Sequence, residues 1–270
     1  CTVVWWEQRG SGMSYSARIP REAMTLEQMI SDTLELTKIL RHRFGKEKIY
    51  LMGHSGGSFI GFHAVARAPE LYHAYLGMAQ MVYQLESERL AYEYMLQRYK
   101  ESGNTKLIRA LEAAPVTMTG GAPPAYIALR DPAMHPLGIG TMHGMHSVIT
   151  GLVLPSLMNR QYTVIEKANT WFAKSRSGVS ILWDGMLATD LSEQVTKLAV
   201  PVYFFHGIYD YTCNYSLAKS YFEKLKAPVK GFYTFERSAH SPTFEEPEKT
   251  LRIMREDVLR GTNSLADRAS

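Results

Sequence analysis

The 270-residue chain has few cysteines and no long hydrophobic run. Cys1 and Cys213 are too few for a disulfide framework in a chain of this length, and they lack the spacing of metal ligands. No apolar stretch approaches the roughly 18 to 20 residues that a membrane helix needs, and no signal peptide is visible. We therefore expect no membrane insertion. The compartment stays open, with a reducing, cytoplasmic one weakly favoured.

The chain also lacks an excess of charge of one sign. Its 30 basic and 26 acidic residues give a formal charge of +4, and no run of lysines or arginines stands out. Dispersed charge of this kind is typical of a solvated surface, so we expect no nucleic-acid partner. The sequence does not indicate the oligomeric state.

What the sequence does contain is a sharp turn between two apolar runs at residues 49–61 (IYLMGHSGGSFIG). The segment 53–57 (GHSGG) fits the pattern G-x-S-x-G, in which small residues let a strand-to-helix turn close tightly and expose the serine hydroxyl. A glycine-rich turn with a buried serine is the alternative interpretation. The residues around it favour a nucleophile elbow at Ser55. They are a strand-like run at 48–52, which we expect to be a parallel strand buried on both faces because it lacks polar alternation, and a helical run at 59–67 that ends before Pro69.

Strand and helix patterns alternate on both sides of this turn. The expected strands cover residues 2–6, 48–52, 74–79, 200–207 and 230–235. The expected helices cover 25–44, with a capping box at Thr25, and then 59–67, 85–101, 105–114, 215–225 and 247–260. Five strands that alternate with helices predict an α/β fold with a mostly parallel sheet flanked by helices. We expect the tail after Gly261 to be loosely held.

The pattern between residues 84 and 197 is different, because it is mostly helical and is broken by a Gly-Gly-Ala-Pro-Pro segment at 120–124. A helical block between two strand-bearing regions predicts an inserted cap. We therefore divide the chain into a first core part at 1–83, a helical cap at 84–197 and a second core part at 198–270.

A serine hydroxyl is a weak nucleophile until a base removes its proton, and the base must be held in one tautomer by a third group. Asp210 follows one late strand and His240 follows the next, which gives the order Ser, Asp, His. Loops at the carboxyl ends of parallel strands share one crevice. We therefore predict a triad of Ser55, Asp210 and His240, with the backbone amide of Gly56 as one oxyanion donor.

Four segments carry a resemblance to a known family: residues 6–14 (WEQRGSGMS), 53–58 (GHSGGS), 205–210 (FHGIYD) and 238–242 (SAHSP). In these segments the chain resembles the α/β-hydrolase superfamily, and within it the branch of proline iminopeptidases and related serine hydrolases. The resemblance implies an α/β-hydrolase fold with an inserted helical cap, a small-molecule or short-peptide substrate, and no cofactor or metal.

The chain departs from this family in two ways. Glu7 stands where the family's loop has an aspartate. The family's glycine-rich loop that supplies a second oxyanion amide would precede residue 2, so we expect that the sequence is the later part of a longer protein. Loss of one such donor typically costs on the order of 100- to 1000-fold in rate.

Several other side chains are candidates for a functional role. We expect His135, His143 and His146 to pack in the cap rather than bind a metal, because their spacing fits no zinc motif. His54 is expected to shape the elbow. Five cap acids are candidates to receive a substrate ammonium, although a solvated helix face is the other interpretation: Glu86, Glu88, Glu93, Glu166 and Asp184. Three aromatic residues are expected in the cap core: Trp171, Phe172 and Trp183.

These observations leave three functional hypotheses. The first is a serine hydrolase of proline iminopeptidase type that cleaves an amide through an acyl-enzyme, and the second is a carboxylesterase of the same fold. The third is an inert α/β-hydrolase scaffold used for binding. A serine nucleophile argues against dehalogenase and epoxide hydrolase chemistry, for which the superfamily uses aspartate.

Overall fold

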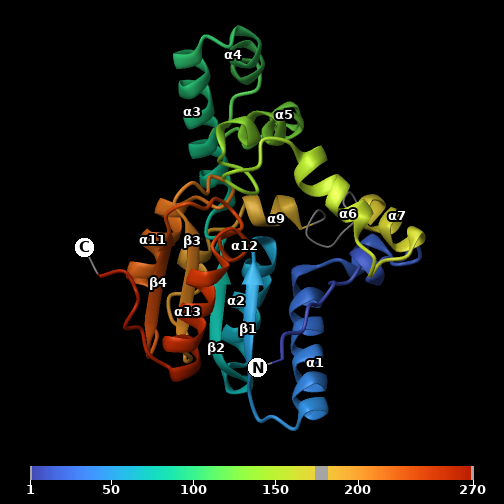
Figure 1. The fold of residues 1–270 in the computed structure, drawn as a ribbon, viewed down its shortest axis with the longest axis vertical. Helices are drawn as coiled ribbons and strands as arrows, with labels where there is room; N and C mark the ends of the chain where they lie inside the picture. The colour runs from blue at the N-terminus through green and yellow to red at the C-terminus, as the bar shows by residue number, and fades with distance from the viewer. Residues whose placement is uncertain (1, 174–181, 269–270) are drawn as a thin grey trace.

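A four-stranded parallel sheet lies at the centre of the structure (Figure 1). The computed structural model describes residues 2–173 and 182–268. The strands are adjacent in chain order: β1 (Ile49–His54), β2 (Tyr72–Met78), β3 (Val202–Gly207) and β4 (Lys230–Phe235). All three pairings are parallel, so the carboxyl ends of the strands meet at one edge. The predicted parallel sheet is confirmed.

Helices cover both faces of this sheet. On one face α2 (Gly56–Arg67) and α11 (Tyr215–Lys224) pack on β2 and β3, where Phe62 meets Tyr75 and Tyr221. On the other face α13 (Pro247–Glu256) contributes Ile253 to a second apolar cluster. A fourth helix, α1 (Leu26–Phe44), lies against α2.

The ends of α1 show why the sequence forms a helix there. Thr25 accepts a hydrogen bond from the backbone N–H of Gln28 at 3.1 Å, as the capping box predicts. The Gln28 side chain instead donates to Asp32, so only half of the box forms. At the other end Gly45 adopts a left-handed conformation, with φ of 59°, and terminates the helix.

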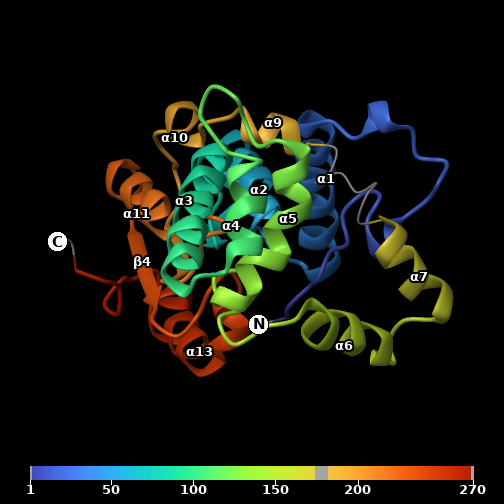
Figure 2. The ribbon, with the colours of Figure 1, turned by 90° about the horizontal axis from the view of Figure 1, so that it is seen from above.

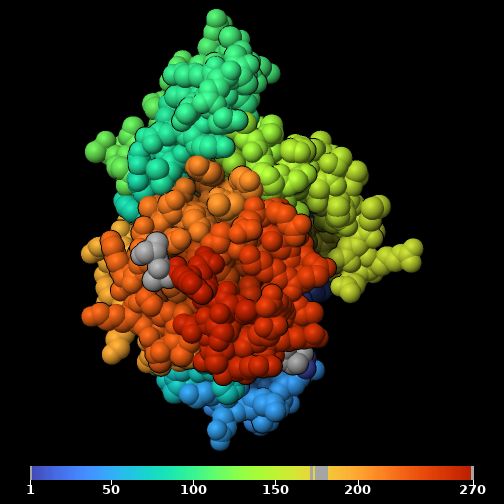
Figure 3. All heavy atoms as spheres, turned by 60° about the vertical axis from the view of Figure 1, so that its left-hand side comes forward, coloured from blue at the N-terminus to red at the C-terminus, as the bar shows by residue number. Residues whose placement is uncertain are grey.

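The chain between β2 and β3 is mostly helical. We call residues 84–194 the helical region. The α-helices among its described residues are α3 (Gln84–Ser102), α4 (Thr105–Glu112), α5 (Pro124–Met134), α6 (Leu154–Met158), α7 (Val164–Ala173), α9 (Trp183–Leu187) and α10 (Leu191–Gln194). Helices α3, α4 and α5 share an apolar core and extend beyond the sheet (Figure 1). Their residues, coloured green, project at one end of the molecule in Figure 3, and α6 and α7 lie to one side of them in Figure 2. The predicted boundaries of a cap domain at 84 and 197 stay a prediction.

Short helical turns join these elements. They are 3-10 turns at Gly12–Ser14, Arg21–Ala23, Pro69–Leu71, His135–Leu137 and Val258–Arg260, a π-helical turn at Ile149–Val153, and the single turn α12 (Pro242–Glu245). The last of these follows the predicted base directly.

The predicted strand at residues 2–6 is wrong. This segment forms no strand in the described part of the chain, and the side chains of Val3 and Trp5 are 68% and 75% exposed. A β-type run becomes a strand only when a neighbouring strand supplies hydrogen bonds, and none pairs with it. Trp5 instead stacks on Phe244, with ring centroids 6.0 Å apart. The described residues therefore form four strands, not five.

Two further expectations are corrected. The run at 48–52 forms β1, but β1 lies at the edge of the sheet and leaves Met52 40% exposed, so it is not buried on both faces. The tail after Gly261 is not loosely held as far as residue 268. The buried Asp257 accepts hydrogen bonds from the N–H groups of Ser264 and Leu265, at 2.7 and 2.8 Å, and ties the tail to the core.

Candidate active site

The turn after β1 has the strained geometry of a nucleophile elbow. Ser55 adopts φ of 54° and ψ of −127°, a conformation that non-glycine residues rarely take. Such a residue costs about 1–3 kcal/mol and persists only where its surroundings hold it. Small neighbours are required here, because a Cβ at Gly53 would lie 2.6 Å from the carbonyl oxygen of Gly57. The predicted strand, turn and helix are therefore all present.

Ser58 and the loop after β2 hold this turn in place. The Ser58 hydroxyl donates to the carbonyl oxygen of Ser55 at 2.6 Å and accepts from the N–H of Met81 at 2.9 Å. The N–H of Ser55 donates to the carbonyl oxygen of Met78 at 3.2 Å. Gly56 is the first residue of α2, where a backbone N–H has no partner within the helix. Its amide is therefore available for an anionic oxygen.

Asp210 lies after β3 and is fully buried. Its Oδ1 accepts hydrogen bonds from the N–H groups of Thr212 and Cys213, at 2.8 and 2.9 Å. Its Oδ2 lies 3.0 Å from Nδ1 of His240 and 3.3 Å from Nε2 of His206. Burial by itself raises the pKa of Asp210, but the two histidines outweigh it and the pKa is lowered. The carboxylate is therefore held ionised.

His240 lies after β4 and is 7% exposed. The structure brings it into direct contact with Asp210, as the sequence predicts, and this bond fixes the tautomer with a proton on Nδ1. His54, the residue before Ser55, donates from Nε2 to the carbonyl oxygen of His240 at 2.8 Å. Their ring centroids are 4.9 Å apart. His240 thus lies beside the elbow.

His54 itself is held neutral. Burial, followed by the nearby charge of His240, lowers the pKa of His54 to about 4. Its contact with the His240 carbonyl oxygen agrees with the expectation that it shapes the elbow.

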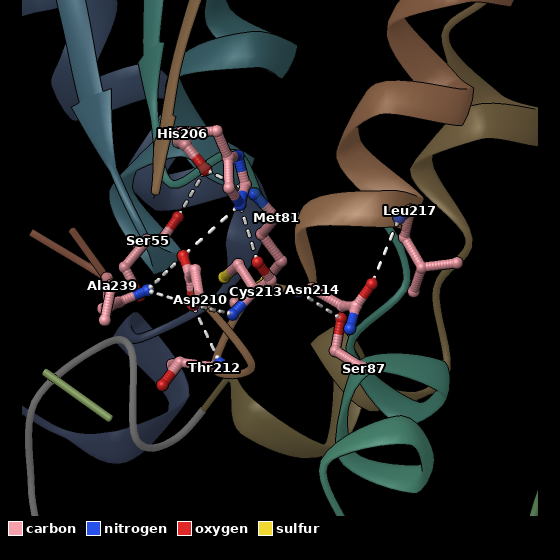
Figure 4. Close-up of polar contacts among 12 residues, drawn as sticks. Ser55, Met81, Ser87, His206, Asp210, Thr212, Cys213, Asn214, Leu217 and Ala239 are labelled. Carbon is pink, nitrogen blue, oxygen red and sulfur yellow. Dashed lines mark hydrogen bonds and ion pairs between the residues drawn. The ribbon is translucent and has the colours of Figure 1, made fainter. Parts of the chain in front are cut away.

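Sequence reasoning missed His206, which stands in the same segment as Asp210. This histidine in β3 is fully buried, and its Nε2 donates to the carbonyl oxygen of Cys213 at 2.7 Å. Figure 4 shows it grouped with Ser55, Asp210 and Cys213. Burial raises the pKa of the Cys213 thiol, so the thiol is protonated. The only signal in the sequence was a histidine followed by a glycine in segment 205–210.

Contacts from α3 fix the loop of Asp210 on its outer side. The side-chain amide of Gln84 donates to the carbonyl oxygen of Thr212 at 2.8 Å. The N–H of Asn214 donates to the hydroxyl of Ser87 at 3.1 Å, a bond that is visible in Figure 4. The helical region therefore contacts the acid's loop through neutral groups.

The loop of His240 passes very close to the end of β3. A Cβ at Gly207 would lie 2.1 Å from the carbonyl oxygen of Ala239, so only glycine fits at this position. Glu246, the residue before α13, supports the loop, because its Oε1 accepts from the N–H of Arg237 and from the hydroxyl of Ser238, at 3.0 and 2.7 Å.

The five candidate acids have different surroundings. Glu88 is fully buried, and its carboxylate pairs with Nε of Arg130 at 2.7 Å and accepts from Tyr126 at 2.9 Å. The other four are at least partly exposed: Glu86, Glu93, Glu166 and Asp184. Glu86 and Glu93 both pair with Arg89. The deepest acid is therefore already neutralised by an arginine.

The candidate histidines of the helical region make backbone contacts. Nδ1 of His135 bonds with the carbonyl oxygen of Asp131 at 2.7 Å, and Nδ1 of His143 bonds with that of Gly138 at 2.9 Å. His146 is exposed. Within residues 2–173 and 182–268, no group of three or more potential ligands is placed to hold a metal ion.

Of the three aromatic residues expected in the cap core, only one has a described side chain. Trp183 is half-buried in α9. The side chains of Trp171 and Phe172 lie outside the described part of the structure. In that described part, no helix combines the length and the apolar character needed to cross a membrane.

Comparison with known proteins agrees with this geometry. A family model described as serine aminopeptidase, S33, matches residues 1–247. "Probable aminopeptidase YbaC" of Bacillus subtilis (strain 168) is 32% identical over 249 residues, which cover 91% of this chain and 76% of that protein. A proline iminopeptidase of Saccharolobus solfataricus is 22% identical over 269 residues, 95% of this chain and 75% of that protein.

The fold is also found among solved structures. An esterase from Exiguobacterium antarcticum superposes with a TM-score of 0.54 at 16% identity, over 92% of this chain and 78% of that chain. The chain therefore belongs to the serine aminopeptidase (S33) family of the α/β-hydrolase superfamily, and it is a hydrolase of the peptidase or esterase kind.

Proposed function

We propose that the protein is a serine hydrolase that cleaves an amide bond of a small substrate through an acyl-enzyme, as an aminopeptidase of proline iminopeptidase type. The observation that carries this proposal is the contact of 3.0 Å between Asp210 and His240 beside the strained turn of Ser55. The names of the relatives support the choice of an aminopeptidase.

In the first half of the proposed reaction, Oγ of Ser55 forms a bond with the substrate carbonyl carbon while its proton passes to Nε2 of His240. Asp210 holds the ring through Nδ1 and stabilises the imidazolium. The amide of Gly56 donates to the oxygen that becomes negative. The carbon–nitrogen bond then breaks, and the leaving amine takes the proton from His240.

In the second half, water attacks the acyl-enzyme. His240 accepts a proton from the water, and the water oxygen bonds to the acyl carbon. The bond to Ser55 breaks, and its oxygen regains the proton from His240. The products are an amine and a carboxylic acid, so atoms and charge balance with no other reactant.

A fluorophosphonate probe tests this mechanism, because it reacts with an activated serine. We expect the wild-type protein to be labelled and Ser55→Ala to remain unlabelled. Ser31→Ala is the matched control, since Ser31 is an exposed serine of α1. Equal labelling of wild type and Ser55→Ala would refute the role of Ser55. An unlabelled wild type would favour an inert scaffold.

A carboxylesterase is the second candidate, because one observation favours it. An aminopeptidase needs a carboxylate for the substrate ammonium, and Glu88, the most buried acid considered, is occupied by Arg130. Prolyl and other aminoacyl anilides should be assayed beside short-chain aryl esters on one preparation. Turnover of the esters alone would exclude the peptidase.

A further inference from the structure

Glu245 ends α12, five residues after His240, and is only partly exposed. Its two carboxylate oxygens accept hydrogen bonds from different parts of the fold. Oε2 accepts from the N–H of Ala239 at 2.9 Å, in the loop of His240. Oε1 accepts from the N–H of His143 at 2.5 Å, in the helical region. One carboxylate therefore joins segments that are far apart in sequence.

The segment on the helical side, residues 138–143, lies against both loops of the proposed triad. The carbonyl oxygen of Gly140 accepts from the N–H of His240 at 3.3 Å, and that of Ile139 accepts from Tyr211 at 3.4 Å. The ring of His143 stacks on Tyr209, with centroids 3.8 Å apart. Residues 138–143 therefore contact the neighbours of Asp210 on one side and His240 on the other.

We propose that Glu245 is a positioning residue, which fixes His240 by binding its loop to residues 138–143 through one carboxylate. The backbone contact between Gly140 and His240 is long, whereas the two bonds to Glu245 are shorter and involve a charged acceptor. The charged contacts therefore set the distance between the two segments. The catalytic consequence rests on the function proposed above.

The charges around Glu245 explain how this contact responds to acid. Burial raises the pKa of Glu245, while the two N–H donors and His143 oppose the shift, and the nearby Glu246 adds to it. Arg237 and His146 face the same surface hollow as Glu245, which gives solvent access to the carboxyl group. Protonation removes the negative charge and turns one oxygen into a hydroxyl group, which is a weaker acceptor for one of the two N–H groups.

The first test compares Glu245→Gln with Glu248→Gln, which removes an exposed carboxylate from the neighbouring helix. Glutamine keeps the shape of the side chain but offers only one acceptor oxygen. We expect fluorophosphonate labelling at pH 7 to be roughly 10- to 100-fold slower in Glu245→Gln, since small displacements of a catalytic group have effects of this size. Glu248→Gln should remain within about twofold of wild type by the small effects of exposed sites.

The second test measures hydrogen exchange and needs no activity. In Glu245→Gln, peptides that cover residues 139–143 and 237–241 should exchange faster, while those of β2 and β3 stay unchanged. Wild-type exchange in both peptides, or labelling within twofold of wild type, would overturn the proposal. If wild type is not labelled at all, the proposed function fails, and the exchange experiment still decides on Glu245.

A third measurement uses wild type alone, so it tests the proposal even if Glu245→Gln does not fold. In wild type, protection of both peptides, corrected for intrinsic exchange, should change together as pH passes through the raised pKa of Glu245, because one carboxyl group contacts both segments. Protection that is independent of pH in this interval would contradict the proposed contact.

Discussion

The loops of Asp210 and His240 differ in the groups that hold them. Neutral side chains of α3, Gln84 and Ser87, hold the loop of Asp210. Carboxylates hold the loop of His240, because Glu245 and Glu246 accept from its backbone and hydroxyl groups. A hydrogen bond between neutral amide and hydroxyl groups does not titrate near neutral pH, whereas a carboxylate changes its charge and its acceptor strength when it is protonated. The comparison teaches that the support of His240 should depend on pH, whereas the support of Asp210 from α3 should not.

The largest effect is expected at the point where the two loops meet. Asp210→Asn removes the charge that orients His240 and leaves an amide beside Nδ1. We expect kcat on an aryl ester to fall by roughly 10³- to 10⁴-fold, as for the loss of the orienting carboxylate in serine proteases. Asp190→Asn is the control, since Asp190 caps α10. A loss of less than tenfold in Asp210→Asn would show that Asp210 does not orient the base.

An added methyl group at Gly207 tests how closely the end of β3 approaches the loop of His240. Gly207→Ala would place a Cβ against the carbonyl oxygens of Ser238 and Ala239, 2.3 and 2.1 Å away. The loop must move, so we expect kcat to fall by about 100-fold and unfolding free energy to fall by about 1–3 kcal/mol.

Gly185→Ala is the matched control, because a Cβ there meets nothing within 4 Å. Activity and denaturant midpoint should be measured for both variants. Equal behaviour of the two would mean that the loop of His240 adapts freely and is not fixed by its neighbours.

The smallest effect concerns the pH dependence of stability, which has opposite signs for the two acids. The pKa of Asp210 is lowered, so its contribution to stability is present above its unfolded value and is lost as pH falls through the folded one. The pKa of Glu245 is raised, so the native state binds its proton more tightly and loses stability as pH rises from the unfolded to the folded value.

Urea denaturation between about pH 4 and pH 7 measures this difference, because the unfolded glutamate titrates near 4.3. In wild type, the ionisation of Glu245 lowers the free energy of unfolding as pH rises. This contribution should be absent in Glu245→Gln. Ser87→Ala, which alters the neutral support of Asp210, should keep the wild-type slope. The same slope in wild type and Glu245→Gln would contradict the raised pKa.

The sequence predicted correctly the features whose geometry depends on a few neighbouring residues. The turn at Ser55 needs a glycine at position 53, and that glycine is visible in the sequence pattern. The contact of Asp210 with His240 followed from their places after neighbouring parallel strands. The limits of β4 and the start of α11 were likewise predicted from local composition.

The sequence was less informative where partners are remote. Residues 2–6 have the composition of a strand, but composition does not show whether a neighbouring strand is present to pair with them. Asp257 holds the tail through N–H groups several residues later, which periodicity does not reveal. Glu245 meets His143 across the boundary between the helical region and the core. Such contacts depend on the packing of whole elements.

The adjacency of β2 and β3 has a consequence for folding. Tyr75 pairs with Val202, although residues 79–201 separate the two strands. Closing a segment of this length has an entropic cost that grows only slowly, by about 0.6 kcal/mol per doubling. Contacts between distant residues nevertheless form slowly. Ser55 and Asp210 lie on opposite sides of this segment, so the proposed triad should be completed late, after the two halves of the sheet have joined.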